Sequence, residues 1–320
     1  MTNRLWLTLG LSGALSVLAL TPLGYGQAPG GTAAAVENTA AVGASIAPPF
    51  PIPRPYPFTV GEKLTYEFSF SRFPLYGKLG ELELAVVAPE TVRETMDALA
   101  SKLRTPETAE RCPAPISPPV LVFQAQARTR GFLPALLRLD IRNDYLSIVD
   151  AADLGLVHNE RALRSRRWER LQMTCQARTA ALRTILERDG DAASPVKVRT
   201  LPSRGWTTDL QTFWHVLRTQ PLTPGVTIPM VLTEDDRIYD IPVLITNEVE
   251  TITTRAGRFR ARKLDLKAYE AGFTRYQGTF FLWLTEDAAR LPVRVRFRAR
   301  GVTVTGDLVR YTPPRSGARR

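Results

Sequence analysis

Apolar and polar residues alternate with a period of two along much of the chain after residue 58. Residues 64–71 read Leu-Thr-Tyr-Glu-Phe-Ser-Phe-Ser, and in residues 293–300 every second position is an arginine. Successive side chains of a β-strand point to opposite faces, so both stretches predict strands with one buried and one solvated face. This pattern is typical of antiparallel sheets.

Other stretches share this strand character and are separated by glycine and proline residues that favour turns. The further strand candidates are residues 82–86, 120–129, 135–149, 156–168, 171–187, 195–200, 226–233, 238–253, 258–270 and 275–284. Residues 280–284 are apolar at every position, which predicts a strand buried on both faces. About a dozen strands exceed what a flat sheet comfortably holds. We therefore expect an all-β domain built as a large curved antiparallel sheet, a partly closed barrel or a two-layer sandwich.

Only two segments carry helix signals. Pro89 is suited to the first turn of a helix, and four apolar residues follow at helical spacing. These residues are Val92, Met96, Leu99 and Leu103. A second helix is predicted over 209–218, with Thr207 or Thr208 as its cap and Asp209 in its first turn. The expected fold is therefore all-β with two short helices.

The chain begins with a segment typical of secretory signal peptides. Residues 1–26 combine Arg4 with an apolar run over 5–20 and small residues before Gln27. The run is shorter than the roughly 18 residues that a spanning helix needs, although an uncleaved anchor is the alternative. We expect export by the general secretory route, which places the protein in the periplasm.

The next segment differs in composition from the rest. Residues 27–57 contain eight alanines and seven prolines, which predicts a disordered tether. A single β domain is expected over 58–311, with an insertion at 88–119. A basic tail follows at 312–320.

Four short sequence blocks stand out beyond the strand pattern. The first is Gly-Glu-Lys-Leu-Thr-Tyr at 61–66, and the second is Leu-Arg-Thr-Gln-Pro-Leu-Thr-Pro-Gly at 217–225. The third is Ala-Gly-Arg-Phe-Arg-Ala at 256–261, and the fourth is Trp-Leu-Thr-Glu-Asp-Ala-Ala-Arg-Leu-Pro-Val at 283–293. In the order and spacing of these blocks, the chain resembles over most of 58–310 the exported family catalogued as domain of unknown function 3108.

This resemblance implies a secreted, mostly β domain that has no assigned reaction. The last block is also similar to the periplasmic lipoprotein-carrier fold, an unclosed barrel with a helical lid. The stretch 88–119 departs from the family pattern, which is why we expect it to be an insertion.

The net charge of +11 falls to +10 without the signal peptide and points to anionic partners. Nucleic acid is not expected as a partner, because the chain lacks a recognition module and an exported protein meets lipid head groups and wall polymers instead. Arginine can hold phosphate or carboxylate through two parallel hydrogen bonds. The candidate anion-binding face consists of Arg294, Arg296, Arg298 and Arg300. A solvated sheet face, whose arginine stems cover apolar surface, is the alternative.

The two cysteines are candidates for a disulfide. Cys112 lies in the insertion and Cys175 lies in the β body. An oxidising compartment favours such a pair, which would fasten the insertion to a strand. Two unpaired thiols are the alternative. The spacing excludes a Cys-x-x-Cys redox or metal motif.

Aromatic residues around the second helix give a different hypothesis. With the helix closing one mouth of a curved sheet, they would line an apolar ligand pocket inside it. The candidate lining residues are Trp206, Phe213, Trp214, Phe280 and Trp283. An ordinary packed core beneath a helix is the alternative.

Catalytic signatures are missing from the sequence. It contains no G-x-S-x-G elbow, P-loop or H-E-x-x-H motif. His215 is expected to be packed or capping within the second helix, and His158 to be polar and at the surface. The acidic clusters at 234–236 and 286–287 lie at strand ends, where acidic residues make turns. We expect no cofactor, no metal and no catalysis, with an unrecognised carboxylate-based hydrolase as the alternative.

The function that these observations favour is binding. We expect an exported, non-catalytic binding or carrier-like protein for a lipid or an anionic envelope component. A structural or assembly factor that acts through contacts with another envelope protein is the alternative.

Overall fold

The computed structural model describes residues 47–112, 119–136, 138–191, 193–266, 269–270, 278–299 and 301–314. The strands are β1 (Lys63–Arg72), β2 (Leu75–Val87), β3 (Val120–Thr129), β4 (Ile141–Asp150), β5 (Leu156–Ser165), β6 (Trp168–Ala177), β7 (Leu182–Asp189), β8 (Lys197–Pro202), β9 (Thr227–Glu234), β10 (Arg237–Thr254), β11 (Gly257–Leu266), β12 (Tyr269–Glu270), β13 (Gly278–Thr285), β14 (Pro292–Ala299) and β15 (Val302–Thr312). The helices are α2 (Pro89–Leu103), α3 (Pro106–Arg111), α4 (Phe132–Leu136) and α5 (Leu210–Thr219).

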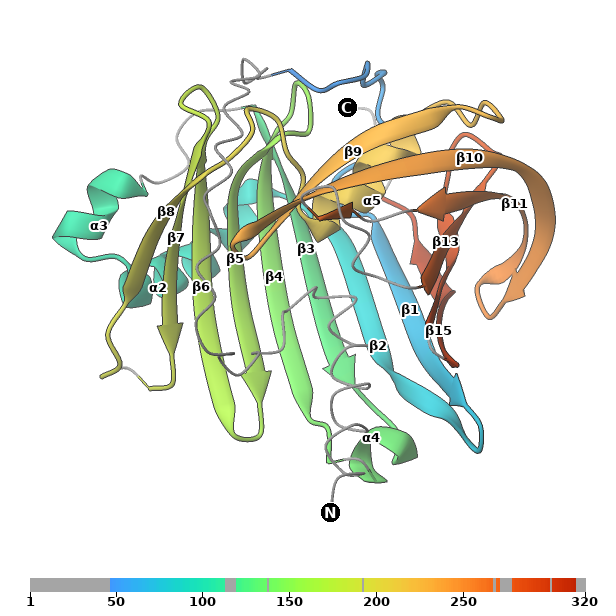
Figure 1. The fold of residues 1–320 in the computed structure, drawn as a ribbon, viewed down its shortest axis with the longest axis horizontal. Helices are drawn as coiled ribbons and strands as arrows, with labels where there is room; N and C mark the ends of the chain where they lie inside the picture. The colour runs from blue at the N-terminus through green and yellow to red at the C-terminus, as the bar shows by residue number, and fades with distance from the viewer. Residues whose placement is uncertain are drawn as a thin grey trace, which may run out of the picture.

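The strands form a single curved sheet in which neighbours run antiparallel. Their order is β12-β10-β11-β13-β14-β15-β1-β2-β3-β4-β5-β6-β7-β8, and β9 pairs with β10 beside this path. The sheet curves strongly but does not close (Figure 1). The predicted all-β class and large curved antiparallel sheet are confirmed.

The elements differ from the predicted ones at β15, which the strand candidates do not include, at the end of β5, which stops at Ser165 rather than 168, and at two turns that lack strong sequence signals. The strand candidate 171–187 is two strands, because a turn at 178–181 forms without glycine or proline; Ala181 supplies the positive φ of 49°. The candidate 135–149 begins only at Ile141, because α4 and its turn occupy its first residues. α3 and α4 are additional to the two predicted helices.

The concave face of the sheet changes from apolar to polar along its width. On β1, β2 and β3 its buried side chains are apolar, and on β4 to β7 they are mainly polar. The apolar set includes Leu64, Phe68, Leu82, Leu84 and Phe123, and the polar set includes Ser147, Asn159, Arg161, Gln172 and Arg183. Both sets are buried because α5 and the β9–β10 hairpin lie across this face (Figure 1).

Helix α5 lies inside the curve of the sheet. It begins where the Asp209 carboxylate accepts a hydrogen bond from the Thr212 amide at 3.0 Å, and it ends before Pro221, which cannot continue the ladder. Residues 211–219 are all buried, so even polar side chains of the helix need partners inside the protein. The predicted second helix is confirmed with a shift of one residue, because its N-cap is Asp209 rather than the expected Thr207 or Thr208.

Strand β10 takes part in two layers. Residues 237–244 pair with β9 and lie over the concave face. Pairing with β11 covers residues 243–245 and, after an irregularity between Ile245 and Val249, residues 249–254. The β10–β11 tip reaches β1, where Arg255 forms an ion pair with Glu67 at 3.1 Å. The hairpin therefore bends away from the concave side and comes to lie against the outer face.

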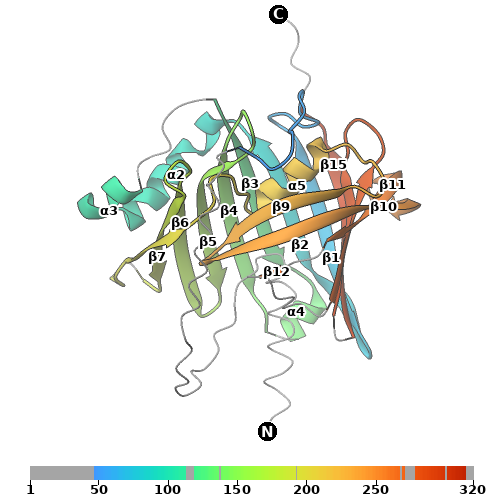
Figure 2. The same cartoon turned by 45° about the horizontal axis from the view of Figure 1, so that its top comes forward.

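The described part of the insertion before β3, residues 88–112, packs on the outer face of β6 and β7. Figure 2 shows α2 and α3 on the side of the sheet opposite to the β9–β10 hairpin. Leu103 and Cys112 from this segment are buried with four residues of β6 and β7. These four are Leu171, Met173, Cys175 and Leu186. A second small core therefore forms outside the main one.

The expected tether does not extend to residue 57. Residues 1–46 lie outside the described part of the chain, and so does the signal peptide predicted there. From residue 47 the chain lies on the β domain: Phe50 contacts Trp206, and the hydroxyl of Tyr56 donates to the carbonyl of Ala151 at 2.8 Å. The folded unit therefore begins before residue 58, because aromatic residues between the prolines find apolar surface to cover.

Candidate functional site

Three of the aromatic residues expected to line an apolar pocket, Trp206, Phe213 and Trp214, are buried in the main core. Two cavities beside Trp214 have volumes of about 10 and 20 Å³. A single water needs about 10–15 Å³, whereas ligand pockets usually offer about 300–1,000 Å³. The space beside Trp214 therefore has no room for a lipid.

The other two aromatic residues lie on opposite faces of β13. Phe280 contacts Trp214 edge to face on the concave side, with ring centroids 6.1 Å apart. Trp283 lies on the outer side, under the guanidinium of Arg296 at 5.3 Å. Strand positions an odd number apart face opposite sides, so the expectation that both residues line one interior is corrected.

The four arginines of the expected anion-binding face have different surroundings. Arg294 forms an ion pair with Asp307 of β15 at 2.5 Å, so its charge is matched within the sheet. Arg296 is half-buried over Trp283, and Arg298 is exposed. Arg300 lies outside the described residues. Two of the four, Arg296 and Arg298, therefore remain as candidates for binding an external anion.

These two arginines line a groove on the outer face of β11, β13 and β14. The groove has a volume of about 540 Å³, which is within the usual range of ligand sites. Its charged and aromatic lining consists of Glu250, Lys263, Phe281, Trp283, Arg296 and Arg298. The sequence pointed to the arginines, but not to the aromatic rings and the lysine beside them.

The charges in the groove are only partly paired. The ammonium of Lys263 lies 4.3 Å from the centre of the Phe281 ring and 2.9 Å from a carboxylate oxygen of Glu248. Glu250 accepts a hydrogen bond from the indole nitrogen of Trp283 at 3.0 Å. Arg298 has no carboxylate partner among the described residues. Three cations face one carboxylate in the lining, so the groove is positive.

The alternation of two neighbouring strands produces this groove. Phe281 is opposite Arg296 and Thr279 is opposite Arg298 in the β13–β14 pair. Because both strands alternate with the same period, the aromatic and basic residues emerge on one face, while Leu282 and Leu284 enter the core. A strand that reads as apolar at every position thus has one face in the core and one in the groove.

Two of the four sequence blocks meet in a buried ion pair. Arg218 of α5 donates hydrogen bonds to both carboxylate oxygens of Glu62, just before β1, at 2.5 and 3.0 Å. The same guanidinium donates to the carbonyls of Pro57 and Ala289. These blocks therefore hold the helix against the first strand rather than forming an open site.

The opening and closing blocks are joined a second time. The hydroxyl of Tyr66 donates to the carbonyl of Pro292 at 2.7 Å. Burial raises the pKa of this phenol well above its usual value, so it stays protonated as a donor. This bond and the Arg218 contacts join the sequence blocks directly, which explains why the blocks occur together in the sequence.

The acidic cluster at 234–236 is partly a turn and partly a buried charge pair. Asp235 makes the β9–β10 turn with a φ of 48°, as the strand-end position predicts. Glu234 is buried and accepts two hydrogen bonds from Arg161 of β5, at 2.6 and 2.8 Å. Burial raises the pKa of the Glu234 carboxyl, and the neighbouring guanidinium of Arg161 opposes that rise. The pair ties the β9–β10 hairpin to the concave face.

The second acidic cluster also serves a turn. Asp287 accepts hydrogen bonds from the backbone amides of Ala289 and Arg290, between β13 and β14. Glu286 pairs with Arg260 and Arg262 of β11, which lower the pKa of its carboxyl. Both carboxylates are engaged at a strand end, which agrees with the predicted turn.

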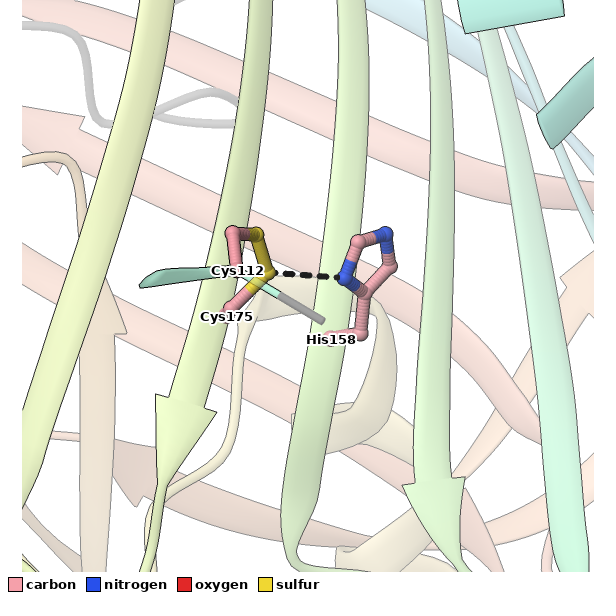
Figure 3. Close-up of side chains that lie close together, drawn as sticks. All are labelled: Cys112, His158 and Cys175. Carbon is pink, nitrogen blue, oxygen red and sulfur yellow. Dashed lines mark hydrogen bonds between the residues drawn. A yellow bond between two sulfur atoms is a disulfide. The ribbon is translucent and has the colours of Figure 1, made fainter. Parts of the chain in front are cut away.

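The structure brings Cys112 and Cys175 together in a disulfide that fastens the insertion to β6. Their Cα atoms are 5.3 Å apart. His158 of β5 lies beside it, with Nδ1 3.3 Å from the sulfur of Cys175 (Figure 3). Its Nε2 lies 3.0 Å from a carboxylate oxygen of Glu160. The sequence predicts a surface position for His158, but the insertion covers it and the side chain is buried.

Within the described part of the chain, this is the one group whose side chains are close enough to hold a metal ion. The two sulfurs and one imidazole nitrogen lie within 4.8 Å of one another. A metal needs deprotonated thiols as ligands, and the disulfide occupies both sulfurs. The oxidised protein therefore uses the group as a covalent fastening.

No helix among the described residues is long and apolar enough to cross a membrane. A search of the curated proteins finds no match. Among solved structures, the chain is similar to a beta-barrel-like protein of domain of unknown function DUF1849 from Brucella abortus, with a TM-score of 0.48, 10% identity, and coverage of 80% of this chain and 98% of that one. It is also similar to a protein with a YmcC-like fold from Bacteroides fragilis, with a TM-score of 0.28, 13% identity and the same coverage.

The family comparison gives a match within the described domain. The model of the proteins of unknown function DUF3108 matches residues 115–308. This range contains three of the four sequence blocks, while the opening block at 61–66 and most of the insertion precede it. The chain belongs to the DUF3108 family.

Proposed function

We propose that this protein is an exported, non-catalytic binding protein that holds a phosphate-bearing amphiphile of the cell envelope in the outer groove. The observation that carries the proposal is the lining itself. Arg296, Arg298 and Lys263 stand beside the rings of Phe281 and Trp283 in a space of about 540 Å³. Cations and aromatic rings in one groove fit a molecule with an anionic head and an apolar part.

The proposed head-group contacts rest on Arg298 and Arg296. A guanidinium can give two parallel hydrogen bonds to a phosphate, which makes arginine better suited to this task than lysine. Arg298 has no competing carboxylate in the described chain, and Arg296 is held in place over Trp283. The ligand would therefore meet one free and one preoriented cation.

The apolar part of the ligand is assigned to Phe281. The ring of Phe281 is only partly buried, and the ammonium of Lys263 lies over it, 4.3 Å from the ring centre. Trp283 is almost completely buried and donates its indole hydrogen to Glu250, so it forms the floor of the groove. A short stretch of acyl chain along Phe281 would remove apolar surface from water.

Export is part of the proposal and rests on two features. Residues 1–26 have the pattern of a secretory signal, and the disulfide between Cys112 and Cys175 is typical of an oxidising compartment. In that compartment the abundant phosphate-bearing amphiphiles are membrane lipids. An interior carrier site has less support, because the cavities beside Trp214 hold about one water each.

Titration calorimetry with a water-soluble lipid tests the proposal. The probe is dihexanoyl phosphatidylglycerol below its micelle concentration, with dihexanoyl phosphatidylcholine as the neutral-head-group comparison. We expect the phosphatidylglycerol to bind, and the double variant Arg296→Gln/Arg298→Gln to bind at least about tenfold more weakly, a loss of about 1.4 kcal/mol. Equal binding by the double variant, or binding of both lipids alike, would count against the groove.

A matched control removes two positive charges elsewhere. Arg93 and Arg111 are exposed and lie outside the groove, so Arg93→Gln/Arg111→Gln should bind the soluble lipid as the wild type does. Inorganic phosphate and hexanol identify which part of the ligand is recognised. Binding of phosphate as tight as that of the lipid would replace the amphiphile by a simple anion.

A further inference from the structure

We propose that one end of the sheet is a docking surface for an anionic lipid bilayer. This surface, called the lower rim, consists of the β1–β2 turn at 72–76, the β3–β4 connection at 130–138 with α4, and the β5–β6 turn at 166–168. It is separate from the groove, and its occupant is the membrane surface rather than a single soluble lipid.

The topology places these three connections together. In an antiparallel sheet successive turns alternate between the two ends, so the first, third and fifth connections share an end. The register agrees: Gly80 pairs with Thr129, and Ile141 pairs with Ser165. Figure 1 shows the β1–β2 turn, α4 and the β5–β6 turn along the lower end of the sheet.

Large apolar side chains are concentrated on the lower rim. Eight are exposed in the described part of the chain, and five of them belong to these three connections. The five, with their exposed fractions, are Phe73 (86%), Tyr76 (63%), Phe132 (80%), Leu136 (56%) and Trp168 (52%). Single exposed apolar residues are ordinary, but such a concentration marks a surface that contacts something apolar.

Helix α4 directs part of its apolar surface outward. Leu133 and Pro134 are buried, and Leu133 lies against Gly77 of β2. Phe132 and Leu136 of the same short helix remain exposed, although the helix has only five residues. The packing of the fold uses the inward pair, so the outward pair is available for a partner.

Unpaired arginines accompany these apolar residues. Arg72, Arg138, Arg166 and Arg167 are exposed and have no carboxylate partner within the described ranges. Aromatic side chains favour the boundary between head groups and acyl chains, and arginines at that depth meet lipid phosphates. This combination of exposed rings and free cations fits an anionic bilayer better than an uncharged apolar partner.

Trp168 provides a natural probe for the docking. It is half exposed, whereas the three other tryptophans of the described chain, Trp206, Trp214 and Trp283, are at most 5% exposed. We expect the protein to sediment with vesicles that contain phosphatidylglycerol, and brominated acyl chains in those vesicles to quench its emission. In the variant Trp168→Phe the quenching should disappear while sedimentation persists in part.

Two further variants separate the apolar from the electrostatic contribution. Phe73→Ser/Phe132→Ser should reduce vesicle binding by about tenfold or more at every salt concentration, since burial of a ring in the interface is not screened. Arg166→Gln/Arg167→Gln should reduce binding at low salt, and the difference from the wild type should vanish in about 1 M salt.

Val60→Ser/Val226→Ser changes two residues of 45% exposure outside the lower rim and should bind vesicles like the wild type. Wild-type protein that fails to sediment, or rim variants that bind as the control does, would overturn the docking surface; the second outcome would leave a protein partner for the rim. The groove variant Arg296→Gln/Arg298→Gln should still dock, so failure of either proposal can be told from failure of the other.

Discussion

Arg218 and Glu62 form an ion pair that is completely enclosed by the protein. The guanidinium is 0% exposed and the carboxylate is 2% exposed, with hydrogen bonds of 2.5 and 3.0 Å between them. Arg218 also donates to the carbonyl of Ala289 in the closing block. One side chain of α5 therefore joins the segment before β1 to the turn before β14.

Removing one member of this pair should be costly. Arg218→Met leaves the Glu62 carboxylate buried without a partner, and we expect the free energy of unfolding to fall by about 3–5 kcal/mol. Urea unfolding followed by circular dichroism measures this loss. The exposed pair of Arg204 and Asp240 is the control, where Arg204→Met should cost at most about 1 kcal/mol.

His215 should make stability depend on pH. It is buried against Phe123, with ring centroids 4.0 Å apart; burial and then the charge of Arg218 lower the pKa of its imidazole to about 3. Below the unfolded pKa of about 6.5 the unfolded chain takes up a proton that the folded protein rejects, so stability is present above that pH and is lost as pH falls toward about 3.

The variant His215→Gln isolates this contribution. Between about pH 6 and pH 4, which lies between the folded and unfolded pKa values of this imidazole, the wild type should lose up to about 1.4 kcal/mol per pH unit more than the variant. The measurement is urea unfolding of both proteins at several pH values. Parallel pH profiles would mean that the folded protein accepts the proton at this site.

The disulfide should contribute strongly to stability. It closes a loop with a sequence separation of 63 residues, for which the chain-entropy model gives about 4 kcal/mol. We expect the double variant Cys112→Ala/Cys175→Ala to unfold at a correspondingly lower urea concentration. Thiol titration in denaturant without reductant should find no free thiol in the wild type; two thiols per chain would show that the bond is absent from the protein.

Gly306 of β15 should resist substitution by any larger residue. A Cβ atom there would overlap the ring of Phe68 in β1 and approach a methyl group of Val295 at 2.9 Å. Gly306→Ala is expected to destabilise the protein by about 1–3 kcal/mol through overpacking. Adding Phe68→Leu should recover part of the lost free energy of unfolding. If the loss in the double variant equals the sum of the losses in the two single variants, a direct clash between the two residues is contradicted.

The alternation of the sequence was sufficient to predict the sheet and most of its strands, because each strand has one core face. It could not place Phe280 and Trp283 correctly, since a strand apolar at every position does not reveal which face meets the core. Positions 280 and 283 are an odd number apart, so the period of two assigns their side chains to opposite faces of the strand. Turns such as the one at Ala181 were missed because an ordinary residue adopts the positive φ.

The groove and the lower rim depend on pairing between segments distant in sequence. Arg296 was visible as a member of an arginine array, but its neighbours Lys263 and Phe281 come from other strands. Likewise, Phe73 and Phe132 are separated by many residues and share an end of the sheet only through its topology. The burial of His158 could not be foreseen either, because it follows from the position of the insertion.

The sheet remains open, and an open sheet has a border that could recruit further strands. At one border lies β8, which is only six residues long and carries Lys197, Arg199 and a terminal Pro202. Short length, positive charge and proline are the means by which natural proteins prevent edge-to-edge association. The composition of β8 therefore disfavours edge-to-edge pairing between chains. Replacing Lys197 and Arg199 by valine should make this edge pair with other chains and aggregate.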